Sequence, residues 1–179
     1  MEKNNTASLI IKMAVLLMVI CAVVSAVLGA VNMITAPVIA DIAAAKTAAA
    51  YNEVLPSTGD YTPVDYSDAN VTAVAKCAEG TVVEVSISGS QSMLALAIGV
   101  DNDGAITGVS VIDHGETPGL GAKAADATTG LRTTLVGQTS GLALDKKGGE
   151  VAPLTGATIT SQAIVDACQI AIDTAANVG

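Results

Sequence analysis

The sequence of 179 residues contains no tryptophan and no phenylalanine, so its aromatic side chains are three tyrosines. Proteins that bind single-stranded nucleic acids stack the bases on aromatic rings. This chain lacks the aromatic side chains that would form such a platform for bases or sugars. A planar ligand would therefore lie on aliphatic side chains and peptide planes.

Basic residues are also scarce. The 8 Lys and Arg residues are outnumbered by 17 Asp and Glu residues, which gives a formal net charge of −9. Nucleic acid and anionic lipid headgroups repel a protein with this balance of charge. We therefore predict no nucleic-acid partner.

Cysteine and histidine are too few and too scattered to suggest a metal site. The spacing of Cys21, Cys77 and Cys168 matches neither a disulfide framework nor a zinc motif. Cys168 falls on the apolar face of a predicted helix, which favours a buried free thiol. His114 has no second histidine or cysteine nearby, which favours a hydrogen-bonding role. We predict no metal ligands and no catalytic residues.

A long apolar run near the N-terminus predicts a membrane helix. No charged residue occurs between Lys12 and Asp41, and residues 13–31 are long enough to span a bilayer. A buried core helix would show a polar face, and the run is longer than the apolar region of a signal peptide. We expect an uncleaved anchor over residues 1–35. Lys3 and Lys12 favour a cytoplasmic N-terminus, with the remaining chain outside the cytoplasm.

Residues 36–70 are expected to be a helical linker followed by a loop. Thr35 is a candidate cap and Pro37 a candidate first-turn residue for an alanine-rich helix over 38–54. Proline and glycine then interrupt the pattern, so 55–70 is predicted to be a loop with short extended pieces.

Alternating apolar residues next predict an antiparallel meander over 81–112. Strands are expected over 81–88, 94–100 and 106–112, with Asp-Asn-Asp-Gly at 101–104 as a turn signal.

The last third of the chain is less regular. Residues 120–150 are expected to hold one short helix over 124–134. Ser161 is expected to cap a final helix in which apolar residues recur at helical spacing. The sequence therefore predicts an α+β fold, in which one membrane helix precedes a single domain over 71–179 with an antiparallel sheet and flanking helices.

Two motifs in this domain carry the functional information. The first is Glu-Thr-Pro-Gly-Leu-Gly at 116–121, directly after a predicted strand. The second is Leu-Thr-Gly-Ala-Thr-Ile-Thr-Ser at 154–161, where a helix start would favour an anion such as phosphate. Taken singly, the first could be an ordinary loop and the second a loop with a cap. The second also lacks the lysine of a nucleotide-binding P-loop and the spaced glycines of a dinucleotide fold.

Together, and behind one membrane helix, the two motifs closely resemble a family of covalent FMN-binding proteins. The chain is similar to the G subunit of the Rnf electron-transport complex. The C subunit of the sodium-translocating NADH:quinone oxidoreductase shares both motifs. The resemblance implies that FMN is joined through its phosphate to the Thr158 hydroxyl. Thr155 then occupies the Ser/Thr position of the motif. Gly156 gives clearance for the phosphate, and the small side chain of Ala157 leaves room for its approach.

The remaining motif residues are expected to surround this cofactor. Thr160 and Ser161 belong to the helix start, and Glu116 and Thr117 are candidates for lining the flavin. The nearby wall is expected to consist of Gly119, Leu120 and Gly121.

The resemblance also implies how the cofactor is attached. A separate flavin transferase would make the bond outside the cytoplasm, using FAD and a divalent metal. Its preferred target carries an aspartate three residues before the Ser/Thr position, where this chain has Ala152.

The implied function is electron transfer rather than substrate turnover. The chain would pass electrons between neighbouring membrane, iron–sulfur and flavin subunits of a complex that couples ferredoxin:NAD oxidoreduction to sodium or proton transport. Two alternatives remain at this point: a component of the quinone-reducing pump, and a membrane-anchored binding module without redox function.

Overall fold

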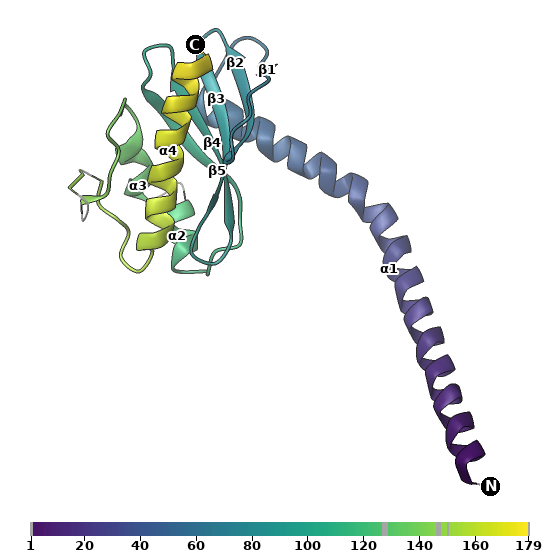
Figure 1. The fold of residues 1–179 in the computed structure, drawn as a ribbon. Coiled ribbons are helices and arrows are strands. Elements are labelled where there is room, and N and C mark those ends of the chain that lie inside the picture. Colours follow the sequence, from purple (N-terminus) through teal and green to yellow (C-terminus); the bar gives the residue numbers. More distant parts are fainter. Residues whose placement is uncertain (1, 127–128, 146–147, 150, 179) are drawn as a thin grey trace. The chain divides into compact units, whose positions relative to one another are not determined.

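The protein forms two compact units, Met1–Ala45 and Lys46–Gly179. The computed structural model describes residues 2–126, 129–145, 148–149 and 151–178, with side chains from Ser8 onward. The first unit is part of one long helix. The second holds a sheet and the remaining helices (Figure 1).

Helix α1, Glu2–Val54, is continuous where we expected an interruption. Pro37 lies inside it, and the Thr35 hydroxyl donates to the Val31 carbonyl within the helix instead of capping a new one. Proline inside a helix removes one backbone hydrogen bond. The apolar and alanine-rich residues on both sides still favour helix. Among the described residues, this is the single helix that is long and apolar enough to cross a membrane.

The second unit is built on a five-stranded sheet whose strands follow one another in chain order, each antiparallel to the next. The predicted meander is confirmed as its last three strands. The strands are β1 Thr62–Val64, β2 Val71–Cys77, β3 Gly80–Ser88, β4 Met93–Asp101 and β5 Ile106–His114. Strand β2 escaped prediction because the pairing register shifts between Val71 and Ala73, which disturbs the alternation of its apolar residues.

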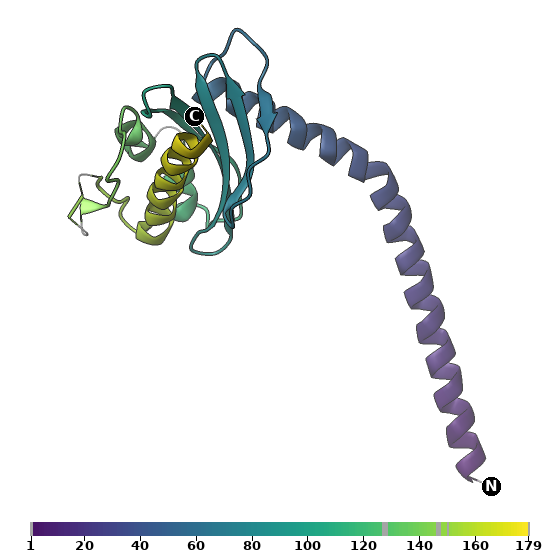
Figure 2. The same cartoon turned by 45° about the horizontal axis from the view of Figure 1, so that its top comes forward.

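The two faces of this sheet differ in side-chain size. Leu94, Leu96 and Ile98 of β4 point to the face covered by helix α4, Thr158–Val178, and form the main core there. Figure 2 shows α4 and the sheet as two layers. On the opposite face, Ala97 and Val82 pack against the last turn of α1 in a smaller core.

Two short helices replace the single helix expected over 124–134. They are α2, Gly121–Ala125, and α3, Gly130–Leu135. Asp126 ends α2 because its backbone is extended, with φ −72° and ψ 133°. Helix α4 begins at Thr158, three residues before the expected cap at Ser161.

The cysteine predictions agree with the fold. Cys168 is a free thiol, fully buried in the main core, and this burial raises its pKa to about 12 because the thiolate is disfavoured there. Cys21 and Cys77 are also free.

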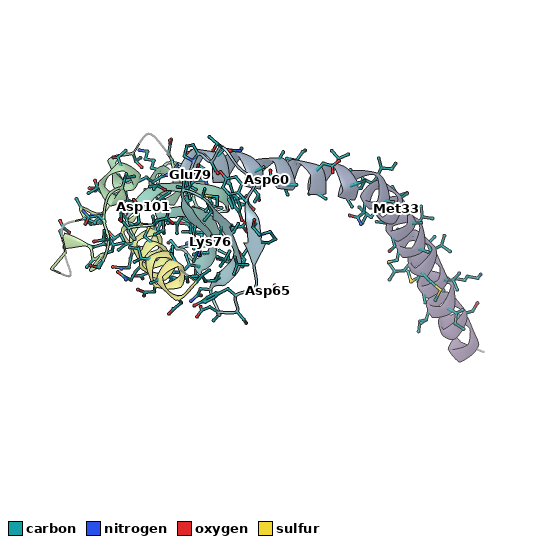
Figure 3. The ribbon with its side chains drawn as sticks, turned by 90° about the horizontal axis from the view of Figure 1, so that it is seen from above. Met33, Asp60, Asp65, Lys76, Glu79 and Asp101 are labelled. Atoms are coloured by element: carbon teal, nitrogen blue, oxygen red, sulfur yellow. The ribbon has the colours of Figure 1, made fainter. Side chains whose placement is uncertain are left out.

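Acidic side chains are spread over the loops and strand ends of the second unit. Four of them, Asp60, Asp65, Glu79 and Asp101, are labelled in Figure 3.

Candidate functional site

The structure brings both sequence motifs to one cavity, although 32 intervening residues separate them in the chain. The cavity has a volume of about 340 Å³, near the lower end of the range for small-molecule sites. Its lining comes from three segments: the β3–β4 connection, the loop after β5, and the start of α4. The lining residues are Ser90, Gln91, Glu116, Thr117, Leu120, Gly121, Gly156, Ala157, Thr158, Ile159 and Thr160.

The first motif forms a tight turn before α2. The Leu120 N–H donates to the Thr117 carbonyl at 3.2 Å, and Gly119 has a φ of +81°. Proline followed by glycine with positive φ is the pattern of a type II turn. Gly119 is therefore needed for the backbone conformation of the turn. The cavity is lined instead by Thr117 and Leu120 of the same turn.

The second motif contains a similar turn directly before α4. The Ala157 N–H donates to the Leu154 carbonyl at 2.9 Å, and Gly156 has a φ of +82°. Thr155 is exposed in this turn and does not line the cavity. The Ala157 carbonyl then accepts from the Ser161 N–H at 2.8 Å, which starts the helix.

The hydroxyl groups of the second motif have different surroundings. Ser161 is fully buried, and its Oγ accepts from the Leu154 N–H at 3.1 Å, so it holds the preceding turn and is not the cap that we expected. Thr160 is fully buried and donates to Glu116. Thr158, by contrast, is exposed as the first residue of α4.

Thr158 lies between two hollows. It lines the cavity described above and a neighbouring, more open one of about 400 Å³ beside Ile87 and Gln162. The first N–H groups of a helix have no partner within the helix and attract anions. The Thr158 hydroxyl is thus presented where a phosphate group would be stabilised.

Glu116 is buried behind this surface, with 5% of its area exposed. One carboxylate oxygen accepts from the N–H groups of Gln91 (2.9 Å) and Ser92 (3.2 Å). The other accepts from the Thr160 hydroxyl at 2.8 Å. Burial raises the pKa of Glu116, but the hydrogen bonds from Gln91, Thr160 and Ser92 outweigh it, so that the pKa lies below its ordinary value.

Gly121 makes the contact between Glu116 and Thr160 possible. A Cβ atom at this position would lie 2.1 Å from the Glu116 carboxylate and 2.9 Å from the Thr160 hydroxyl. The second glycine of the first motif therefore provides clearance.

Ser90 and Gln91 line the cavity but were not predicted. They lie in the connection between β3 and β4, and nothing in the Gly-Ser-Gln-Ser sequence distinguishes it from an ordinary polar turn. His114 was expected to form hydrogen bonds, and its Nδ1 accepts from the Glu116 N–H at 3.4 Å. The described residues contain no group of three or more His, Cys, Asp or Glu side chains that could hold a metal ion.

Comparison with known proteins yields a consistent set of relatives. A family model described as an FMN-binding domain matches residues 89–173, a range that includes both motifs. The chain is 36% identical over 183 residues to the G subunit of the ion-translocating oxidoreductase complex of Methanosarcina acetivorans, covering 92% of this chain and 93% of the relative. It is 31% identical over 191 residues to the G subunit of the Na(+)-translocating ferredoxin:NAD(+) oxidoreductase complex of Acetobacterium woodii, covering 91% and 90%.

Proposed function

The chain belongs to the family of G subunits of ion-translocating oxidoreductase complexes, and from this premise we propose that it is the FMN-carrying electron-transfer subunit of such a membrane complex. The complex would couple ferredoxin:NAD oxidoreduction to sodium or proton transport, as the name of the Acetobacterium woodii relative states for sodium. Its partners would be the other membrane, iron–sulfur and flavin subunits. Bound FMN supplies the redox chemistry, because it accepts and donates electrons.

We propose Thr158 as the residue that carries the FMN. The observation that supports this assignment is the contrast among the hydroxyl groups of the second motif. Thr160 and Ser161 are buried and hydrogen-bonded, and Thr155 lies outside the cavity lining, whereas Thr158 is exposed at the helix start and lines the cavity. Free N–H groups of the first turn would stabilise the phosphate.

The attachment step is a transfer of FMN from FAD by a flavin transferase. The Thr158 hydroxyl oxygen forms a bond to the FMN phosphorus, the P–O bond of the FAD pyrophosphate breaks, AMP leaves, and the hydroxyl proton is released. A covalent bond suits a domain outside the cytoplasm, because such a domain cannot rebind FMN from a cytoplasmic pool.

The cavity walls have distinct tasks in this proposal. Thr117 and Leu120 offer exposed surface next to Thr158, with 51% of Leu120 exposed. An aliphatic surface suits a planar ring in a chain without tryptophan or phenylalanine. Both oxygens of the Glu116 carboxylate accept hydrogen bonds from protein groups, so this carboxylate holds the cavity wall together.

Fluorescence of the denatured protein tests the assignment of Thr158. After co-expression with the flavin transferase, we expect the wild-type chain to give a fluorescent band on a denaturing gel under ultraviolet light. Thr158→Ala should give no band, because the acceptor oxygen is missing. Thr72→Val, which removes the hydroxyl of an exposed threonine in β2 outside both motifs, should keep it. A fluorescent Thr158→Ala protein would show that another hydroxyl carries the flavin.

We also propose that the N-terminus is cytoplasmic and that the second unit lies on the other side of the membrane. Lys3 and Lys12 precede the apolar run, and basic residues favour the cytoplasmic side. Fused after residue 179, alkaline phosphatase should be active and green fluorescent protein dark, because only the former folds outside the cytoplasm. The reverse result would invert the proposed orientation.

A further inference from the structure

Glu116 joins the three segments that form the cavity wall. Its carboxylate accepts from the N–H groups of Gln91 and Ser92 in the β3–β4 connection, and from the hydroxyl of Thr160 in α4. Glu116 itself belongs to the loop after β5. A single side chain thus links all three segments.

We propose that Glu116 is a positioning residue for flavin attachment. It holds the first turn of α4 against the two loops, and so sets the position of the Thr158 hydroxyl without touching the transferred phosphate itself. The inference rests on the proposed role of Thr158 as the flavin acceptor. It adds a structural role for Glu116, which is buried behind the cavity surface.

The chemistry of the three partners suits a carboxylate. Gln91 and Ser92 contribute backbone N–H donors, and Thr160 contributes an O–H donor. An ionised carboxylate has acceptor sites for all of them, and hydrogen bonds to a charged group are stronger than neutral ones. The lowered pKa of Glu116 agrees with the ionised form at neutral pH.

Two glycines leave the space that the carboxylate fills. A Cβ atom at Gly89 would lie 2.5 Å from one carboxylate oxygen, and a Cβ atom at Gly121 would lie 2.1 Å from the other. The backbone on both sides is therefore shaped around this group, as expected of a built-in contact rather than a chance one.

Thr160 connects this arrangement to the proposed acceptor. It is fully buried two residues after Thr158, in the same first turn of α4. Fixing the Thr160 side chain therefore fixes the backbone that carries the Thr158 hydroxyl. A displacement of about 1 Å at a reacting group can lower a rate about a hundred-fold.

The test measures flavin attachment with purified components. Full-length chain in detergent is incubated with the flavin transferase, FAD and Mg²⁺, and the initial rate of protein-bound fluorescence is followed as the chain concentration varies. We expect Thr160→Val and Glu116→Gln to lower kcat at least about ten-fold, with KM for the chain unchanged within about two-fold. Thr160→Ser keeps the hydroxyl and should restore kcat to within about two-fold of wild type.

A matched control comes from β2. Thr72 is an exposed threonine whose hydroxyl also faces a glutamate, lying 3.5 Å from the Glu84 carboxylate. Thr72→Val should label at the wild-type rate. The double variant Glu116→Gln with Thr160→Val should be no slower than the slower single variant, because both single changes weaken the same contact between residues 116 and 160.

The outcomes separate this inference from the proposed function. Failure of the wild-type chain to be labelled at Thr158 would refute the proposed function. Wild-type labelling together with an unchanged kcat for folded Thr160→Val or Glu116→Gln would refute the positioning role alone. Unfolding of both variants, judged by tyrosine fluorescence, would also overturn it, because the carboxylate would then serve the fold in general.

Discussion

At the scale of single residues, the glycines of the first motif divide two tasks between them. Gly119 adopts a φ of +81° within a turn, and a Cβ atom there would meet none of the described residues within 4 Å. Gly121 instead leaves room for the contact between Glu116 and Thr160. One glycine is needed for its backbone conformation and the other for its missing side chain.

Gly121→Ala should therefore destabilise the protein by about 1–3 kcal/mol, because the added methyl group overlaps the Glu116 carboxylate. Gly130→Ala is the matched control, since Gly130 also opens a short helix and a Cβ atom there meets, among the described residues, one atom at 4.0 Å. It should be neutral or slightly stabilising. Urea unfolding followed by tyrosine fluorescence measures both, and equal stability of the two variants would contradict the clearance argument.

The sequence identified these glycines but not their separate tasks. A Pro-Gly pair predicts a turn from local preferences alone. The clearance at Gly121 depends on Thr160, which is 39 positions later in the chain, and no local pattern reports such a contact.

At the scale of elements, the last turn of α1 is fastened to the face of the sheet opposite α4. Gly99 and Gly108 let the backbone of Val54 approach the sheet, since a Cβ atom at either would lie within 2.8 Å of it. The Thr107 hydroxyl donates to the Val54 carbonyl. Arg132 of α3 reaches the same place, pairing with Glu53 at 3.0 Å.

Arg132→Met should cost about 2–3 kcal/mol, because the buried guanidinium also donates to the Val109 carbonyl and its loss leaves that group without a charged donor. Glu53→Gln should cost less than about 1 kcal/mol, because 52% of the Glu53 side chain is exposed. Urea unfolding of the full chain in detergent, followed by tyrosine fluorescence, compares the two. A loss in Glu53→Gln as large as that in Arg132→Met would contradict this ranking, because it would show that the contacts of the Glu53 carboxylate with Arg132 and Ser110 outweigh the contact of Arg132 with Val109.

At the scale of the whole molecule, the membrane helix and the second unit share one continuous element. The compact unit Lys46–Gly179 includes the end of α1, whereas we expected residues 36–70 to be a linker before a domain over 71–179. Ala50, Val54 and Leu55 are buried in the smaller core with Val82 and Ala97. The end of the helix is thus part of the second unit.

A fragment of residues 46–179 should consequently fold alone, and one of residues 56–179 should be less stable by about 3–6 kcal/mol. The shorter fragment loses the burial of Val54 and Leu55, and each such side chain contributes about 1.5–3 kcal/mol. Thermal unfolding followed by circular dichroism would show the difference as a lower midpoint. Similar midpoints for the two fragments would place the domain boundary after residue 55.

The sequence by itself determined the long apolar helix that could cross a membrane, the antiparallel strands, and the two motifs that lead to the FMN-binding family. These features depend on local composition, on periodicity along the chain, or on short contiguous patterns. Only the tertiary structure decided which hydroxyl is buried and which is exposed, that Glu116 joins three segments, and that the end of α1 packs on the sheet. Each of these depends on contacts between residues far apart in the chain, which arise when the sheet and helices pack.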